Sequence, residues 1–165
     1  ANKQTLNHIQ DFNTYNKEYK IAAIGASTGG PQIIQQILND LPENFLLPIL
    51  IVQHIASGFV DGFIDWLNTT TKLKVKIAEE GEMPMPGFVY LAPDDYHLGI
   101  LKTSRTIKLS KEGKENGLRP AVSYLFRSVS EAYSEQAIGI LLTGMGKDGF
   151  SMMNRGSKRR RPKMR

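Results

Sequence analysis

Two kinds of hydrophobic pattern alternate along the chain and predict alternating strands and helices. Continuous apolar runs, typical of strands that are buried on both faces of a helix-covered parallel sheet, occupy residues 20–24, 48–54 and 137–143. Apolar residues at helical spacing occupy residues 31–38, 59–68 and 123–133. Because strands that alternate with helices favour parallel pairing, we expect an α/β fold: a doubly wound, mainly parallel sheet with helices on both faces.

Shorter patterns add detail to this expectation. Residues 75–78 and 88–92 are short strand candidates, and residues 98–101 and 106–110, separated by a polar turn, predict one antiparallel hairpin. The second expected helix carries an aromatic stripe, which we expect to lie in the core rather than to form a platform for a ligand. Its members are Phe59, Phe63, Trp66 and Leu67.

Composition favours one globular domain. The chain has 165 residues, of which 41% are hydrophobic, enough for a sizeable core. It contains no cysteine, which excludes disulfides, thiolate nucleophiles and cysteine metal sites. The polar N-terminal segment lacks the apolar core of a signal peptide, and no later run approaches transmembrane length, so we expect a cytoplasmic location.

The net charge of +5 comes from one end of the chain. Residues 151–165 hold seven basic and no acidic side chains, whereas the rest of the chain holds fourteen basic and sixteen acidic ones. This run lacks the interleaved aromatic residues of single-strand binders, so we interpret it as a tail and expect no specific nucleic-acid partner. We expect a polar linker over 1–19, a folded domain over 20–149 and a basic, disordered tail over 150–165.

Three strand ends carry residues that are suited to nucleophilic catalysis. Ser27 lies on a glycine-rich turn that fits G-x-S-x-G, His54 ends the second apolar run, and Asp148 follows the third. The carboxyl ends of parallel strands meet at one edge of a sheet. Serine needs a base to take its proton, histidine titrates in the right range, and a carboxylate orients the imidazole. The three residues therefore predict a Ser-His-Asp triad.

Each member also has a simpler interpretation. Ser27 could cap the helix that follows it, His54 could be an ordinary core or surface histidine, and Asp148 could be a turn residue. His97 is a rival candidate for the base, although no strand directs it toward Ser27. A phosphate-binding turn is a further alternative, but the pattern lacks the lysine of a P-loop.

Five ordered blocks of the sequence together resemble the catalytic domain of the CheB-type protein-glutamate methylesterases of bacterial chemotaxis. The blocks are IGASTGGP (24–31), VQH (52–54), YLAP (90–93), RPAVSYLF (119–126) and LTGMGKDG (142–149). The resemblance implies hydrolysis of glutamate γ-methyl esters, and in some members deamidation of glutamines, on the cytoplasmic helices of chemoreceptors. Methylated chemoreceptors are thus the implied partners, and no metal or organic cofactor is implied.

The resemblance also implies roles for individual residues. Ser27 would be the nucleophile, His54 the general base and Asp148 its orienting carboxylate. Thr28 and Met145 match positions near the serine, and the backbone N–H of Met145 resembles an oxyanion donor. His97 and Arg119 match positions that line the site.

The chain departs from the family pattern at both ends. Family members usually carry a receiver domain before the catalytic one, and here only a short polar segment precedes it. After Gly149 the resemblance ends and the basic run follows, so we expect the domain to be incomplete and the strand at 137–143 to lack a neighbour. The alternative to an active esterase is a catalytically weak or inactive domain that binds receptors or other proteins.

Overall fold

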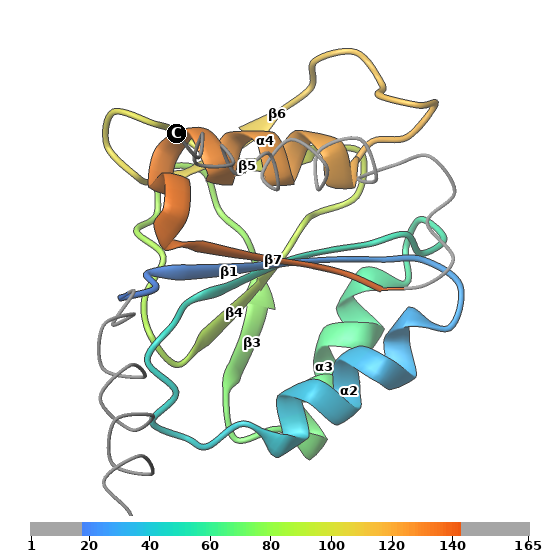
Figure 1. The fold of residues 1–165 in the computed structure, drawn as a ribbon. Coiled ribbons are helices and arrows are strands. Elements are labelled where there is room, and N and C mark those ends of the chain that lie inside the picture. The colour runs from blue at the N-terminus through green and yellow to red at the C-terminus, as the bar shows by residue number, and fades with distance from the viewer. Residues whose placement is uncertain (1–17, 143–165) are drawn as a thin grey trace, which may run out of the picture.

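The computed structural model describes residues 18–142, and Figure 1 shows how their elements are arranged. Within this part, five strands form a parallel sheet in the order β3-β4-β2-β1-β7. The strands are β1 (Ile21–Ala26), β2 (Ile49–Gln53), β3 (Lys74–Ile77), β4 (Phe88–Leu91) and β7 (Ala137–Leu141). The expected tail at 150–165 and all but the last two residues of the expected linker lie outside the described residues.

Helices cover both faces of this sheet. Helices α2 (Gly30–Asp40) and α3 (Val60–Thr70) lie below it in Figure 1, and helix α4 (Val122–Tyr133) lies above it, followed by the short 3₁₀ helix η2 (Ser134–Gln136). The expected hairpin is present as the antiparallel pair β5 (His97–Ile100) and β6 (Ile107–Ser110), which packs beside α4. The structure therefore confirms the doubly wound α/β fold.

Side chains that alternate along the strands supply two separate cores. On β1, Ile21 and Ala23 belong to the core under α4 and the hairpin, whereas Ala22 and Ile24 belong to the core under α2 and α3. Leu125 of α4 is fully buried in the first core, and a buried leucine contributes about 1.5–3 kcal/mol. Burial on both faces explains why β1 and β2 are continuous apolar runs.

Prolines set both ends of α2. Pro31 lies in the first turn of the helix, where its missing N–H costs no hydrogen bond. Leu41 ends the helix with an extended backbone, which is the conformation that the following Pro42 imposes on it. Gly29 precedes the helix with φ +78°, a left-handed conformation that glycine adopts without strain. Gly29 and Pro31 therefore fix where the turn that carries Ser27 ends and α2 begins.

Two burial predictions are wrong. The strand β7 was expected to be buried, but four of its residues are only partly buried and Gly139 is exposed, because β7 is an edge strand of the described sheet. Phe59 and Trp66 were expected in the core, but they are 65% and 40% exposed. The buried stripe of α3 starts at Val60 instead, so Phe59 lies before the helix and Trp66 lies at the border of the stripe, in ring contact with Phe63.

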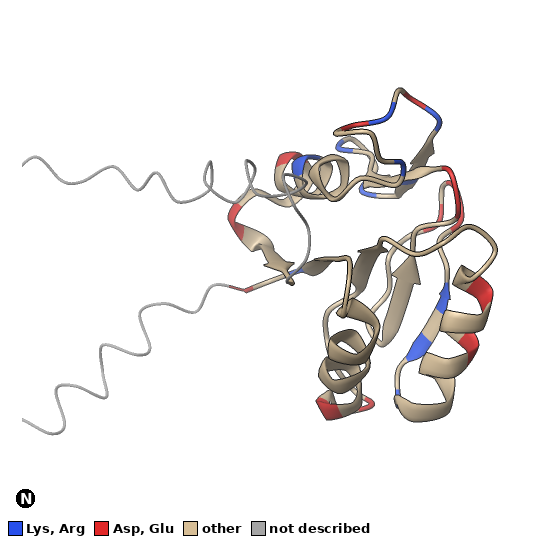
Figure 2. Ribbon diagram, turned by 90° about the vertical axis from the view of Figure 1, so that its right-hand side faces the viewer, with Lys and Arg blue, Asp and Glu red and all other residues tan. Residues whose placement is uncertain are grey.

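Charges of both signs mix over the described surface. Figure 2 shows basic and acidic positions in succession along the loop at the top, which joins β6 to α4. Between residues 18 and 142, no helix is long and apolar enough to cross a membrane.

Candidate active site

The chain changes its direction across the sheet at β1. From β1 it passes through α2 to β2 on one side, and it returns through α4 to β7 on the other side of β1. Helices α2 and α4 lie on opposite faces, as Figure 1 shows. In open α/β sheets, ligands bind outside the carboxyl ends of the strands at such a reversal point. Ser27, the first residue after β1, lies at this point.

The register of the strands brings Ser27 and His54 to neighbouring strand ends. Ala26 pairs with Gln53, so Ser27 and His54 are the residues that follow a matched pair on adjacent parallel strands. The N–H of His54 donates to the carbonyl of Ala26 at 2.9 Å, which extends the pairing by one residue. The two residues were predicted to meet at one sheet edge, and this edge holds both.

Ser27 is not the cap of α2. The N-cap residue is Gly29, and no side chain makes a capping hydrogen bond. The carbonyl of Ser27 accepts the N–H of Gly30 at 2.8 Å, which closes the turn through the backbone and leaves the hydroxyl out of it. Ser27 is half-buried and Thr28 is exposed. The capping interpretation of Ser27 is therefore wrong.

Gln53, which sequence reasoning did not single out, connects the two strand ends. Its side-chain Nε2 donates to the carbonyl of Ser27 at 2.9 Å and to the carbonyl of His54 at 3.0 Å. The sequence offered one signal for this role, because Gln53 is the last residue of a buried strand and precedes the candidate base His54. Pattern alone does not show that the side chain turns into the neighbouring loop.

A pocket of about 100 Å³ opens beside His54. Three segments line it: the end of β2, the loop after β4 and the segment before α4. The lining residues are Gln53, His54, Ile55, Ala92, Asp94, Leu118, Arg119 and Pro120. Ser27 is not one of them, because it follows the next strand of the sheet. The pocket thus offers room for a side-chain-sized group next to the imidazole.

Asp94 holds the loop that follows His54. Its Oδ2 accepts the N–H of Gly58 at 2.7 Å and the hydroxyl of Ser57 at 3.3 Å. The loop after β2 is thereby attached to the loop after β4, so two walls of the pocket are joined. Sequence reasoning missed Asp94, although the argument about strand ends applies to β4 as well.

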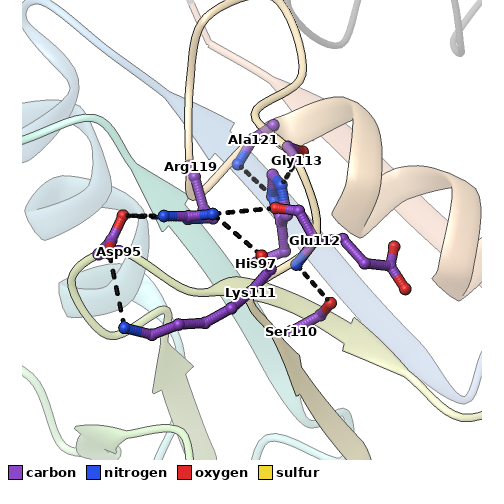
Figure 3. A network of polar contacts seen from close by, with 8 residues as sticks. All are labelled: Asp95, His97, Ser110, Lys111, Glu112, Gly113, Arg119 and Ala121. Atoms are coloured by element: carbon purple, nitrogen blue, oxygen red, sulfur yellow. Dashed lines mark hydrogen bonds and ion pairs between the residues drawn. The ribbon is translucent and has the colours of Figure 1, made fainter.

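Arg119 is fixed at the pocket rim by a polar network, which Figure 3 shows. Its Nε and Nη2 donate to Oδ1 of Asp95 at 3.0 and 2.7 Å, and its Nη1 donates to the carbonyls of Lys111 and Glu112 at 3.0 and 3.1 Å. The hydrogen bond from Arg119 holds the pKa of Asp95 below its ordinary value, although desolvation acts in the opposite direction. The guanidinium of Arg119 is therefore held at the rim of the pocket, paired with the carboxylate of Asp95.

His97 lies beneath the network rather than in the pocket lining. It is fully buried, its Nδ1 accepts the N–H of Ala121 at 3.2 Å, and its Nε2 lies 3.0 Å from the carbonyl of Gly113 (Figure 3). An Nε2–H tautomer satisfies both contacts, since Nδ1 then accepts and Nε2 donates. The ring also stacks on Tyr124, with 4.6 Å between the ring centroids. This geometry suits a structural histidine and argues against the rival base.

The remaining expected residues, Asp148 and Met145, lie outside the described residues. The chain leaves β7 beside β1, where the N–H of Leu142 donates to the carbonyl of Gly25 at 2.9 Å. The described residues hold no group of three or more His, Cys, Asp or Glu that could bind a metal ion.

Comparison with known proteins places this geometry in a family. The profile of the CheB methylesterase family matches residues 22–159. The chain is 53% identical over 139 residues to the protein-glutamate methylesterase/protein-glutamine glutaminase 1 of Syntrophus aciditrophicus, and 52% identical over 136 residues to a similarly named protein of Geobacter metallireducens. These matches cover 84% and 82% of this chain but 39% of each relative, so the chain spans about two fifths of their length.

A solved structure supports the same assignment. The crystal structure of the Thermotoga maritima CheB methylesterase catalytic domain superimposes with a TM-score of 0.79 at 43% sequence identity, over 84% of this chain and 74% of that one. The family profile, the sequence identities and the structural match agree. The chain belongs to the CheB methylesterase family.

Proposed function

We propose that this chain hydrolyses the γ-methyl esters of glutamate residues, and deamidates glutamines, on the cytoplasmic helices of chemoreceptors. The observation that carries the proposal is the placement of Ser27 and His54 on adjacent strand ends at the reversal point of the sheet. The names of the relatives, protein-glutamate methylesterase/protein-glutamine glutaminase, support both substrate types. Because the proposed substrate faces the cytoplasm, we also propose that the chain acts there.

The proposed reaction has two halves. His54 takes the proton of the Ser27 hydroxyl as the oxygen attacks the γ-carbonyl carbon, and a tetrahedral oxyanion forms. When this tetrahedral intermediate collapses, the C–O bond to the methoxy group breaks, His54 gives the proton to the methoxy oxygen, and methanol leaves. Water then attacks the glutamyl ester of Ser27 in the same manner and yields glutamate. A glutamine substrate follows the same course with ammonia as the leaving group.

Two further residues complete the proposal. Asp148 would orient the imidazole of His54 and stabilise its charged form, and the backbone N–H of Met145 would donate to the oxyanion. The pocket beside His54 has room for one side chain of a larger helical partner.

Methanol release from methylated receptor fragments tests the proposal. We expect this chain to exceed its Ser27→Ala and His54→Gln variants by 10³-fold or more, roughly what a triad contributes. Ser104→Ala is the matched control, because Ser104 is an exposed serine on the turn between β5 and β6 whose hydroxyl hydrogen-bonds with that of Thr106, also on this turn. Equal background rates for the parent and Ser27→Ala, in well-folded samples, would instead favour a domain that binds receptors without catalysis.

A further inference from the structure

We infer that Gln53 is a positioning residue that fixes the catalytic turn of Ser27 relative to His54, an inference that rests on the proposed function. Gln53 contacts the backbone of both residues, and the contacts are to their carbonyl groups. It therefore acts through the positions of the two residues rather than through the reacting atoms.

The bridge uses both hydrogens of one amide nitrogen. Nε2 lies 2.9 Å from the carbonyl oxygen of Ser27 and 3.0 Å from that of His54, so each of its N–H groups has one acceptor. A glutamate at this position would place a carboxylate oxygen, which only accepts hydrogen bonds, against two carbonyl oxygens. An apolar side chain would supply no hydrogen-bond donor. Of the side chains with this shape, glutamine is the one that can join these two carbonyls.

The other end of the amide argues for a role beyond stability. The residue is only 6% exposed, and its Oε1 has no hydrogen-bond partner among the described residues. A buried carbonyl that accepts no hydrogen bond lowers stability, whereas an apolar residue at this strand end would avoid that cost. Features that lower stability in this way are expected at functional sites.

Gly30 makes room for the bridge. A Cβ at position 30 would lie 2.1 Å from Oε1 of Gln53 and 2.7 Å from Cβ of Ala26, which no side chain tolerates. The absence of a side chain at Gly30 thus lets the Gln53 amide pass close to the first turn of α2 and reach the carbonyl of Ser27. Gly30 of the turn and Gln53 of β2 therefore form one structural unit.

Loss of the bridge would affect the rate of chemistry more than substrate binding. A misplacement of about 1 Å between reacting groups can cost about 10²-fold in rate. Without Nε2, the Ser27 carbonyl keeps its bond from Gly30, but the link that Gln53 makes between the turn and the end of β2 is lost. We therefore expect a fall in kcat with little change in KM.

The test compares Gln53→Met with a matched control, Asn68→Leu, in the full chain. The Asn68 side chain also makes two hydrogen bonds to backbone, donating to the carbonyl of Val75 at 2.8 Å and accepting its N–H at 2.9 Å, but it lies between α3 and β3, remote from the site. We expect Gln53→Met to lower kcat for methyl-ester hydrolysis by about 10- to 100-fold with KM within about twofold, and Asn68→Leu to leave kcat unchanged. A Gln53→Met kcat within twofold of the parent, or an equal fall in both variants, overturns the inference.

A second measurement does not depend on activity. In nuclear magnetic resonance spectra of the parent chain, both side-chain amide protons of Gln53 should exchange slowly with solvent, and Gln53→Met should shift the backbone signals of Ser27 and His54. Rapid exchange of these protons, or unchanged signals, would overturn the bridge. If the parent and Ser27→Ala release methanol equally, the proposed function fails, but these spectra still decide whether Gln53 joins the two residues.

Discussion

Replacement of His97 by phenylalanine separates a structural histidine from a catalytic one. Phenylalanine keeps an aromatic ring of similar size against Tyr124, so the stacked contact at 4.6 Å between centroids is retained. What disappears are the two hydrogen bonds of the imidazole, to the N–H of Ala121 and to the carbonyl of Gly113. The perturbation is therefore confined to polar contacts.

The expected loss of stability follows from the surroundings of the two partners. Ala121 is fully buried, so its unpaired N–H costs about 1–3 kcal/mol. Gly113 is exposed, so water can replace the ring at its carbonyl and the net loss there is about 0.5–1.5 kcal/mol. Together we expect His97→Phe to lower the free energy of unfolding by about 1.5–4.5 kcal/mol.

Urea unfolding, followed by the fluorescence of Trp66, the one tryptophan of the sequence, measures this loss. The activity of the folded fraction should stay within about threefold of the parent, because His97 does not line the pocket. His54→Gln should show the opposite result, with stability nearly unchanged and activity lost. If His97→Phe is as stable as the parent yet inactive, His97 acts in catalysis and the structural interpretation is refuted.

Two further predictions concern the polar network and the packing of β1. Because Arg119 lowers the pKa of Asp95 in the folded chain, the pair stabilises the fold above about pH 4, and this contribution is lost as the pH falls further. The melting temperatures of the parent and Asp95→Asn should therefore differ at pH 7 and converge in acid. A difference that stays constant with pH would contradict this prediction. A Cβ at Gly25 would lie 2.3 Å from Cγ1 of Val122. Gly25→Ala should therefore lower the free energy of unfolding in urea by about 1–3 kcal/mol, and by less in a Val122→Ala background. Strictly additive losses of stability would show that the two side chains do not collide.

The order of strands and helices was predictable from the sequence, because most strands of a parallel sheet covered on both faces are continuous apolar runs. Apolar runs such as that of β2 located the strands, and the rule that parallel strands share a carboxyl edge predicted that Ser27 and His54 lie at the same edge of the sheet. The position of Phe59 was not predictable from spacing, because the helix begins one residue later and directs that ring to solvent.

Polar contacts between distant segments were harder to predict. The bridge from Gln53 depends on the direction of one side chain at a strand end, and that direction depends on the room left at Gly30. Resemblance alone assigned His97 to the lining of the site, but the hairpin and the loop after it enclose the ring. The support that Asp94 gives to the loop after β2 likewise depends on how two separate loops approach each other.

The pairing of β1 with β7 has a consequence for the way this domain folds. The first and last strands of the described chain are neighbours, with Ile21 opposite Ala137, so almost all of the intervening chain must be synthesised before β1 has a partner on both sides. Pairing over such a separation closes a long loop and slows folding. Until β7 arrives, one edge of β1 is open, and we expect the reversal point of the sheet to form last, after the strands β2, β3 and β4 have assembled on the other side.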